Sequence, residues 1–259
     1  MSNKIQHFAA KLAQAEATRV GIDPITSTNP DITVNEAYHI QLENIKKKVK
    51  EGRKIVGKKI GLTSVAVQKL LGVNEPDYGH LLDTMVIENG GNISCETMIQ
   101  PKVEGEIAFI LKHDLKGPNV TVLDVLQATD YVVPALEIVD SRIQDWKIKL
   151  QDTVADNASS GFYVLGGKPT KITDINLELM GMALYQNGEV VNTGVGAAAL
   201  GNPALCVAWL ANRLADYDIP LKAGEVILSG ALSGMVVAKP GDTFTARFAH
   251  LGQVSVNFK

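Results

Sequence analysis

The sequence predicts an α+β protein in which a helical N-terminal portion precedes a mixed, β-rich core. Apolar residues recur at helical spacing over about the first 50 positions. Beyond them, short β-rich runs are separated by Gly, Pro, Asn and Asp, and helical patterns interrupt these runs only twice. Because strands and helices do not alternate regularly, the pattern disfavours a doubly wound parallel sheet.

Two helices are expected in the N-terminal portion. Apolar residues from Ile5 to Leu12 follow the helical repeat. A capping box from Thr33 to Glu36 begins the second helix, and Gly52 is a plausible end for it. The segment 21–30 is rich in Pro, Ser, Thr and Asn, which predicts a loop between the two helices.

The core is expected to contain strands and two helices of its own. The helices begin at Thr121 and at Asn202, where capping residues precede apolar stripes that extend to residues 129 and 216. The strands are expected at 102–111, 131–139, 162–165, 182–185, 226–229, 243–248 and 254–258. We therefore predict a helical subdomain over residues 1–55 and a β-rich catalytic core over residues 56–259, which together form one continuous structural unit.

Composition excludes several function classes. Hydrophobic residues make up 46% of the 259 positions, enough for a large core. The net charge of −3 comes from 25 basic and 28 acidic residues, so neither nucleic acid nor an anionic membrane is an expected partner. The sequence has no apolar run long enough for a membrane span, its N-terminus has no signal-peptide pattern, and its two cysteines form no zinc or redox motif. A cytoplasmic protein is the expectation.

Two glutamates on one predicted strand are candidate metal ligands. Successive side chains of a strand point to opposite faces, so Glu104 and Glu106 share one face while Ile107 and Phe109 occupy the other. Carboxylates this close repel each other, and each favours its protonated form unless a cation lies between them. A bound metal ion would remove that cost.

A third carboxylate, Glu137, lies within an otherwise apolar predicted strand, where an unpaired charge is costly to bury. Carboxylate ligands without Cys or His favour Mg²⁺ or Mn²⁺ over Zn²⁺. Spacing alone leaves an alternative open. Glu104 and Glu106 would then line a solvated strand face, and Glu137 would pair with an Arg or Lys.

Lys54, Lys58 and Lys59 lie close to Gly57 and Gly61, and glycines allow a backbone to approach a ligand closely. A lysine in a dry site can act as a base or bind a substrate anion. Taken alone, this stretch favours solvated lysines on an edge strand over a lysine in a dry site.

Two later segments combine small and polar residues. The stretch from Asp152 to Gly161 can bring hydroxyls and backbone N–H groups to a carboxylate, and it is equally typical of a plain turn. The glycine-rich stretch from Ser229 to Gly234 can expose N–H donors to an anion, although it lacks the spacing of a P-loop. The histidines are scattered, and His80 is expected in an exposed loop.

Nearly the whole chain resembles the 2-hydroxypentadienoate hydratases of catechol meta-cleavage pathways. These enzymes are close relatives of 4-oxalocrotonate decarboxylases within the fumarylacetoacetate hydrolase superfamily. The matching stretches are GKKIGLTSVAVQKLLGV, PDYGHLLDTM, IQPKVEGEIAFIL, VVPALEIVDSRIQDWKIKLQDTVADNASSG, GAAALGNPALCVAWLAN and LKAGEVILSGAL. The resemblance implies a mixed β-sheet roll surrounded by helices.

The resemblance also implies roles for individual residues. The glutamates of VEGEI and PALEIV, which are Glu104, Glu106 and Glu137, correspond to the metal ligands. Lys59 in the K-x-G-L-T motif corresponds to a catalytic lysine, and Asp77 in PDYG to a residue of the site. The substrate-carboxylate region corresponds to Ser159, Ser160, Ser229 and Gly230.

The expected substrate is a small 2-oxo or 2-hydroxy-dienoate acid. Its carboxylate and C2 oxygen would chelate the metal ion, and Lys59 and Asp77 would share proton transfer and water activation, in an order that the sequence leaves open. Hydration of 2-hydroxypenta-2,4-dienoate to 4-hydroxy-2-oxopentanoate is favoured, because RIQDWKIKLQDTVADNAS and SGALSGMV look like the hydratase version.

Three alternatives stay open. A 4-oxalocrotonate decarboxylase would need a second cation for its dicarboxylate substrate, for which Arg142 is the candidate. TVLDVLQATDYVVPALE is also similar to 2-oxohept-3-enedioate hydratases, and a non-catalytic interaction subunit is a further class. The resemblance suggests a homo-oligomer and a complex with the partner enzyme of the pathway.

Overall fold

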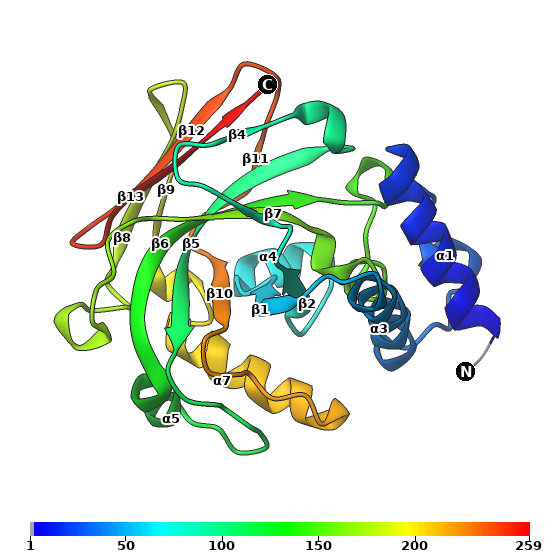
Figure 1. The fold of residues 1–259 in the computed structure, drawn as a ribbon, viewed down its shortest axis with the longest axis horizontal. Coiled ribbons are helices and arrows are strands. Elements are labelled where there is room, and N and C mark those ends of the chain that lie inside the picture. The colour runs from blue at the N-terminus through cyan, green and yellow to red at the C-terminus, as the bar shows by residue number, and fades with distance from the viewer. Residues whose placement is uncertain (1–2) are drawn as a thin grey trace.

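The computed structural model describes residues 3–259, in which a large curled sheet lies between a smaller sheet and several helices (Figure 1). The α-helices are α1 (Asn3–Thr18), α2 (Ile25–Thr28), α3 (Val34–Lys50), α4 (Val65–Leu71), α5 (Val122–Ala128), α6 (Leu150–Ala155) and α7 (Pro203–Leu214). Short 3₁₀ helices are η1 (Cys95–Thr97), η2 (Gln144–Trp146), η3 (Asn157–Ser159), η4 (Ile172–Asp174), η5 (Gly196–Ala198) and η6 (Ala215–Tyr217). None of the helices within residues 3–259 is long and apolar enough to cross a bilayer.

The strands divide between the two sheets. The large sheet contains β1 (Ile55–Gly61), β2 (Asp77–Leu82), β3 (Val86–Ile87), β5 (Pro101–Leu111), β6 (Thr129–Asp140), β7 (Ser160–Leu165), β10 (Val226–Ala231) and β11 (Val236–Val237). The small sheet contains β4 (Asn92–Ile93), β8 (Gly181–Gln186), β9 (Glu189–Val195), β12 (Thr243–Phe248) and β13 (Gly252–Phe258). All seven strands expected from the sequence are present, and their ends differ from the expected ones by at most two residues.

The N-terminal helices form as expected and pack onto the core. Thr33 and Glu36 form the capping box of α3. Gln41, on the buried face of α3, donates hydrogen bonds to the carbonyls of Tyr78 (3.0 Å) and Val154 (2.6 Å). Residues 21–30 differ from the expected loop, because they include the four-residue helix α2. The division of the chain at residue 55 stays a prediction.

The large sheet mixes parallel and antiparallel pairs, which confirms the α+β class. Its order is β2-β1-β10-β5-β6-β7-β3, and β11 pairs separately with β5. Strand β1 runs antiparallel to β2 and parallel to β10, while β10, β5, β6 and β7 are antiparallel neighbours. The central strands β1, β10, β5 and β6 therefore come from three distant parts of the chain and lie side by side (Figure 1).

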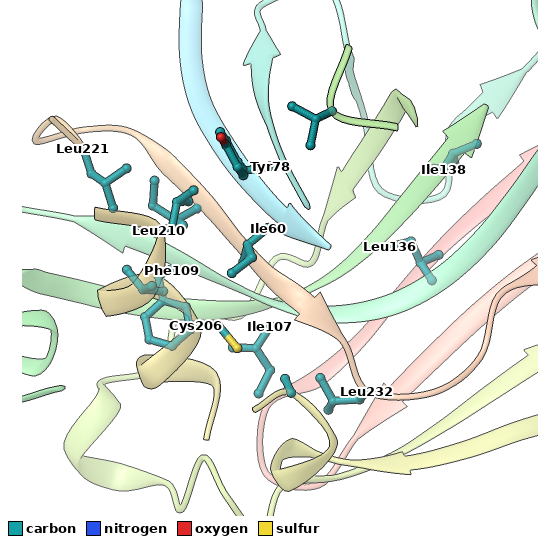
Figure 2. Close-up of a cluster of buried hydrophobic side chains, with 14 of the residues drawn as sticks. Ile60, Tyr78, Ile107, Phe109, Leu136, Ile138, Cys206, Leu210, Leu221 and Leu232 are labelled. Atoms are coloured by element: carbon teal, nitrogen blue, oxygen red, sulfur yellow. The ribbon is translucent and has the colours of Figure 1, made fainter. Parts of the chain in front are cut away.

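One face of the large sheet forms part of the main apolar core. Figure 2 shows Ile107 and Phe109 of β5 beside Cys206 and Leu210 of α7, with Ile60 of β1 close by. All five side chains belong to one buried cluster. Because residues alternate along each strand, the glutamates of β5 and Lys59 of β1 must point to the opposite face.

Candidate metal centre and active site

Strand pairing brings three glutamates together. Glu104 of β5 lies directly opposite Glu137 of β6, and Glu106 lies opposite Ala135, so all three carboxylates share one face of the sheet. One carboxylate oxygen from each lies within 4.8 Å of the others. The exposed fractions of Glu104, Glu106 and Glu137 are 8%, 0% and 1%. The alternative of a solvated strand face is therefore wrong.

Burial and mutual repulsion disturb the ionisation of this cluster. Burial, together with the charge of Glu137, raises the pKa of Glu104 to about 8. The pKa of Glu106 is raised well above its usual range by burial and by the charges of Glu137 and Glu104. Burial also raises the pKa of Glu137, although the Lys59 ammonium opposes that shift. A divalent cation would relieve all three shifts at once.

The donor set of the cluster fits a hard divalent ion. Oε1 of Glu106 and both carboxylate oxygens of Glu137 accept no hydrogen bond from the residues that the structure describes. The backbone N–H of Gly230 donates to Oε2 of Glu106 at 2.8 Å, which orients that carboxylate. Buried carboxylate oxygens without partners are suitable ligands for Mg²⁺ or Mn²⁺. Glu104, Glu106 and Glu137 could hold such an ion.

Lys59 faces this cluster from β1. Its side chain is buried, and its Nζ lies 3.3 Å from Oε1 of Glu137 and donates to the carbonyl of Ala158 at 2.9 Å. Burial alone would lower the pKa of Lys59, but the charges of Glu137, Asp77 and the other glutamates outweigh burial and raise it. The expectation of an exposed edge strand is wrong, because β1 lies between β2 and β10.

Asp77 lies beside Lys59 at the start of β2. Its Oδ2 accepts a 2.6 Å hydrogen bond from the hydroxyl of Thr153, whereas its Oδ1 has no partner among residues 3–259. Gly61 makes this proximity possible. A Cβ atom on Gly61 would lie 2.4 Å from Oδ1 of Asp77 and 3.0 Å from Nζ of Lys59. The chain therefore holds an unpartnered carboxylate oxygen next to an ammonium group.

These groups open into a cavity of about 300 Å³. Its lining combines polar groups, which are the Glu104 and Asp77 carboxylates, Lys59 and several hydroxyls, with apolar side chains. The lining residues are Lys59, Gly61, Leu62, Thr63, Ser64, Val67, Asp77, Glu104, Val139, Trp146, Ile148, Thr153, Ala158, Ser159, Ala231, Ser233, Gly234 and Met235. Among these residues Lys59 is the single basic side chain. The cavity is of the size and character that suits a small organic anion.

The structure brings only one of the four residues expected to bind the substrate carboxylate to this cavity. Ser159 lines it. The hydroxyl of Ser160 donates to the carbonyl of Asn157, and that of Ser229 donates to the carbonyl of Ile107. Gly230 uses its N–H for Glu106. The hydroxyl of Ser159 likewise donates to the Asp156 carboxylate at 3.3 Å. All four residues therefore form bonds within the protein, and their substrate roles stay predictions.

Arg142 does not line the cavity. Its guanidinium group donates to the Asp156 carboxylate and to the carbonyls of Asp140, Asp156 and Ser160. Burial lowers the pKa of Arg142, but the Asp156 charge and other nearby carboxylates outweigh burial, so that the pKa is raised. The guanidinium group is therefore used within the protein, and the substrate role of Arg142 stays a prediction.

The sequence reasoning missed several residues of the site. The hydroxyl of Thr63 is buried, lines the cavity and has no partner in the described part of the chain. Thr153 positions Asp77, and Trp146 and Met235 add apolar side chains to the lining of the cavity. The only available signal was the proximity of these residues to recognised motifs. His80 was expected in an exposed loop, but it is buried on β2.

Comparison with known proteins agrees with this geometry. A family model described as the fumarylacetoacetate (FAA) hydrolase C-terminal family matches residues 49–259. The chain belongs to this family. Its mixed sheets and surrounding helices are those that the resemblance predicted.

Two relatives and one solved structure are especially similar. The chain is 51% identical to a 2-keto-4-pentenoate hydratase of Paraburkholderia xenovorans strain LB400, with 98% of this chain and 94% of that protein covered. It is 47% identical to a 2-hydroxyhexa-2,4-dienoate hydratase of Comamonas testosteroni, with 100% and 99% covered. The structure of a 4-oxalocrotonate decarboxylase from Pseudomonas putida G7, complexed with magnesium and adipate, superimposes with a TM-score of 0.96 at 39% identity and covers 98% of this chain and 97% of that one.

Proposed function

We propose that this protein hydrates 2-hydroxypenta-2,4-dienoate to 4-hydroxy-2-oxopentanoate in a metal-dependent reaction. The observation that carries the proposal is one cavity lined by Lys59, Asp77 and Glu104 together with apolar side chains, with Glu106 and Glu137 clustered around Glu104. The 51% identity to a named hydratase over nearly the full chain supports the same reaction.

A divalent ion held by the three glutamates would act as a Lewis acid toward the carboxylate and the C2 oxygen of the substrate. The remaining chemistry belongs to the chain. The C2 hydroxyl must lose its proton and a proton must reach C5 to give a 2-oxo-3-enoate. Water must then add at C4 and lose one proton, while a proton reaches C3. Lys59 carries N–H donors into the cavity for this purpose.

In the proposed mechanism Asp77 accepts the proton of the attacking water. Its Oδ1 is free to do so, because Thr153 occupies only Oδ2. Asp77 and Lys59 both lie beside Gly61 and line the cavity, so both can exchange protons with the same bound substrate or water. The hydroxyl of Thr63, which has no partner among the described residues, can donate to the substrate from the wall of the cavity.

The cavity lining favours a monocarboxylate, because Lys59 is its single basic side chain and Trp146, Ile148 and Met235 are apolar. Outside the lining, the Lys102 ammonium lies 4.2 Å from the centre of the Trp146 ring and is the counter-charge that a second carboxylate could use. Decarboxylation of 4-oxalocrotonate is the second candidate, because the structure of that decarboxylase is so similar. Hydration of a 2-oxoheptenedioate is less well supported by this cavity.

Parallel incubations test the proposal. The purified protein, with and without Mg²⁺, receives 2-hydroxypenta-2,4-dienoate or 4-oxalocrotonate, and the products are identified by NMR and by CO₂ release. We expect Mg²⁺-dependent formation of 4-hydroxy-2-oxopentanoate. Release of CO₂ from 4-oxalocrotonate without hydration would establish the decarboxylase instead. No turnover of either acid in the Mg²⁺-replete protein would favour an interaction subunit.

We also propose that the protein is a cytoplasmic homo-oligomer that binds the partner enzyme of its pathway. Support comes from β9, which lies at the edge of the small sheet and exposes Val190 and Val195. Exposed apolar residues on an edge strand are typical of a contact surface. Light scattering after size-exclusion chromatography measures the oligomer, and Val190→Lys is expected to reduce its mass.

A further inference from the structure

Three consecutive residues beside Lys59 adopt a left-handed backbone. The φ angles of Asn157, Ala158 and Ser159 are 53°, 50° and 53°. Residues with a Cβ atom seldom adopt this conformation, and runs of it are rarer still. We call residues 157–159 the left-handed turn. Such backbone persists only where its surroundings hold it, and it is concentrated at functional sites.

The side chain of Asn157 ties this turn to β2. Its Oδ1 accepts from the backbone N–H of His80 at 2.8 Å, and its Nδ2 donates to the carbonyl of His80 at 2.9 Å. The hydroxyl of Ser160 donates to the carbonyl of Asn157 at 2.8 Å. Both ends of one side-chain amide are therefore used to hold the turn against the strand.

Arg142 holds the residues on both sides of the left-handed turn. Its guanidinium group donates to the carboxylate and the carbonyl of Asp156, which precedes the turn, and to the carbonyl of Ser160, which follows it. The backbone N–H of Arg142 adds a 3.0 Å bond to the Asp156 carboxylate. One buried side chain thus fixes the entry and the exit of the turn.

Gly79 allows the turn to lie directly on the sheet. Gly79 is the register partner of Lys59 across the β1–β2 pair. A Cβ atom at Gly79 would lie 2.5 Å from the carbonyl oxygen of Asn157, a distance that real Cβ atoms do not show. The close approach places the turn next to the lysine.

The turn presents a carbonyl to the Lys59 ammonium. Nζ of Lys59 donates to the Ala158 carbonyl at 2.9 Å and lies 3.3 Å from Oε1 of Glu137. An ammonium has three donors. The Ala158 carbonyl accepts one of them, and Glu137 forms only an ion pair with the ammonium, so a donor is left for the cavity, which Lys59 lines. The direction of that donor depends on where the Ala158 carbonyl lies.

We propose that Asn157 and Arg142 are positioning residues, which hold the left-handed turn so that the Ala158 carbonyl orients the Lys59 ammonium toward the substrate. This inference rests on the proposed function, because it assumes that Lys59 takes part in turnover. It also assigns Arg142 a role inside the protein in place of a contact with a second substrate carboxylate.

Asn157→Ala tests the inference directly, and Asn212→Ala is its matched control. The amide of Asn212 makes the same pair of bonds with the backbone of Val120, at 2.8 Å and 2.9 Å, and Asn212 lies on α7. We expect Asn157→Ala to lower kcat by about 10- to 100-fold with KM changed by less than about threefold, since small displacements of a catalytic group are costly. Mg²⁺ affinity should stay the same, and Asn212→Ala should keep full kcat. Full kcat in Asn157→Ala would overturn the inference.

A double-mutant cycle with Lys59→Ala separates positioning from general structural damage. If Asn157 acts through Lys59, Asn157→Ala should lower the residual turnover of Lys59→Ala by less than about twofold. An equal loss in both backgrounds would overturn the inference and leave the proposed function intact. Unchanged turnover in Lys59→Ala alone would instead remove the proposed role of the lysine.

Gly79→Ala gives a second, independent answer if Asn157→Ala does not fold. The added methyl displaces the turn and removes no hydrogen-bonding group. Gly181→Ala is its control, because a Cβ atom at Gly181 meets nothing within 4 Å. We expect Gly79→Ala to lower kcat and preserve Mg²⁺ affinity measured by calorimetry, and Gly181→Ala to change neither. Full kcat in Gly79→Ala would overturn the inference.

Discussion

Lys58 and Lys59 are neighbours on β1, yet they leave it on opposite faces of the large sheet and meet opposite electrostatic conditions. Both are buried, with 3% and 2% of their surface exposed. Lys58 forms two short bonds with the single carboxylate of Glu225, at 2.7 Å and 2.6 Å. Lys59 faces Asp77 and three glutamates, and its partners leave several carboxylate oxygens without hydrogen bonds.

The difference shows how a lysine buried in a structural ion pair can be distinguished from a lysine buried at a functional site. Around Lys58 positive and negative charges balance. Burial lowers the pKa of Lys58, and the Glu225 charge, which raises that pKa, does not fully offset the effect of burial. Around Lys59 negative charge exceeds positive charge, and the unpartnered oxygens belong to groups that line or adjoin one cavity. A protein retains such an excess of negative charge where a bound ligand compensates for it.

The largest effect is expected from comparing Lys59→Met with Lys58→Met. Loss of a proton-transfer group lowers turnover by about 10²- to 10⁴-fold, so Lys59→Met should lose that factor in kcat. Lys58→Met should keep the kcat of the original protein, because Lys58 is not among the residues that line the cavity. Steady-state kinetics with saturating Mg²⁺ checks both. Similar losses in the two variants would show that the comparison is mistaken.

The acidic partners of the two lysines should differ in the same way. Glu106→Gln removes a charged oxygen ligand, so Mg²⁺ affinity measured by calorimetry should fall by more than about 100-fold, and turnover should fall with it. Glu225→Gln, on the other face, should leave Mg²⁺ affinity unchanged. If Glu106→Gln binds Mg²⁺ as tightly as the original protein does, the three glutamates are not the metal site.

Substitution of Lys58, which should leave kcat unchanged, should have a large effect on the free energy of unfolding. Lys58→Met leaves the Glu225 carboxylate buried without its partner, which should lower the free energy of unfolding by about 3 kcal/mol or more. Replacing both residues, with Lys58→Met and Glu225→Leu, should recover most of that loss. Urea denaturation measures the two variants. A double variant no more stable than the single one would mean that Lys58 contributes through packing of its alkyl chain.

The smallest effect concerns His80, which lies opposite Lys58 in the β1–β2 register. Burial and the Lys58 charge lower the pKa of His80 to about 3. Between pH 3 and about 6.5 the unfolded chain therefore binds a proton that the folded protein does not bind, and this term lowers stability as the pH falls.

We expect His80→Gln to weaken the acid-induced loss of stability by up to about 1.4 kcal/mol per pH unit in that range. Urea denaturation at pH 7.5 and pH 5 measures the difference. If both proteins lose the same free energy between these two pH values, His80 is already charged in the folded state.

The sequence predicted what depends on local pattern. The alternation along residues 102–111 placed Glu104 and Glu106 on one face, and the apolar run around Glu137 marked that carboxylate as unusual. The register that sets Glu137 opposite Glu104 depends on pairing between distant segments, which periodicity does not contain. The resemblance to a family supplied that link. The hairpin turn at Asn187-Gly188 was a local signal that went unused, so β9 was missed.

The rest of the site depends on backbone geometry and tertiary contacts. The Asp152–Gly161 segment contains no glycine before its last residue, so nothing in it predicts three successive positive φ angles. Arg142 was the candidate second cation for a dicarboxylate substrate, and nothing in the sequence indicated its ion pair with Asp156, fourteen residues further along the chain. The burial of β1 was missed because its lysines suggest solvent, and each of them finds its counter-charge only in the folded protein.

The position of β10 has a consequence for the order of events during synthesis. This strand, from Val226 to Ala231, lies between β1 and β5 and supplies the Gly230 N–H that orients Glu106. A nascent chain that has already emerged with its glutamates and Lys59 therefore lacks the strand that joins them. The metal centre cannot reach its final geometry on the ribosome until more than 120 residues beyond Glu106 have been translated.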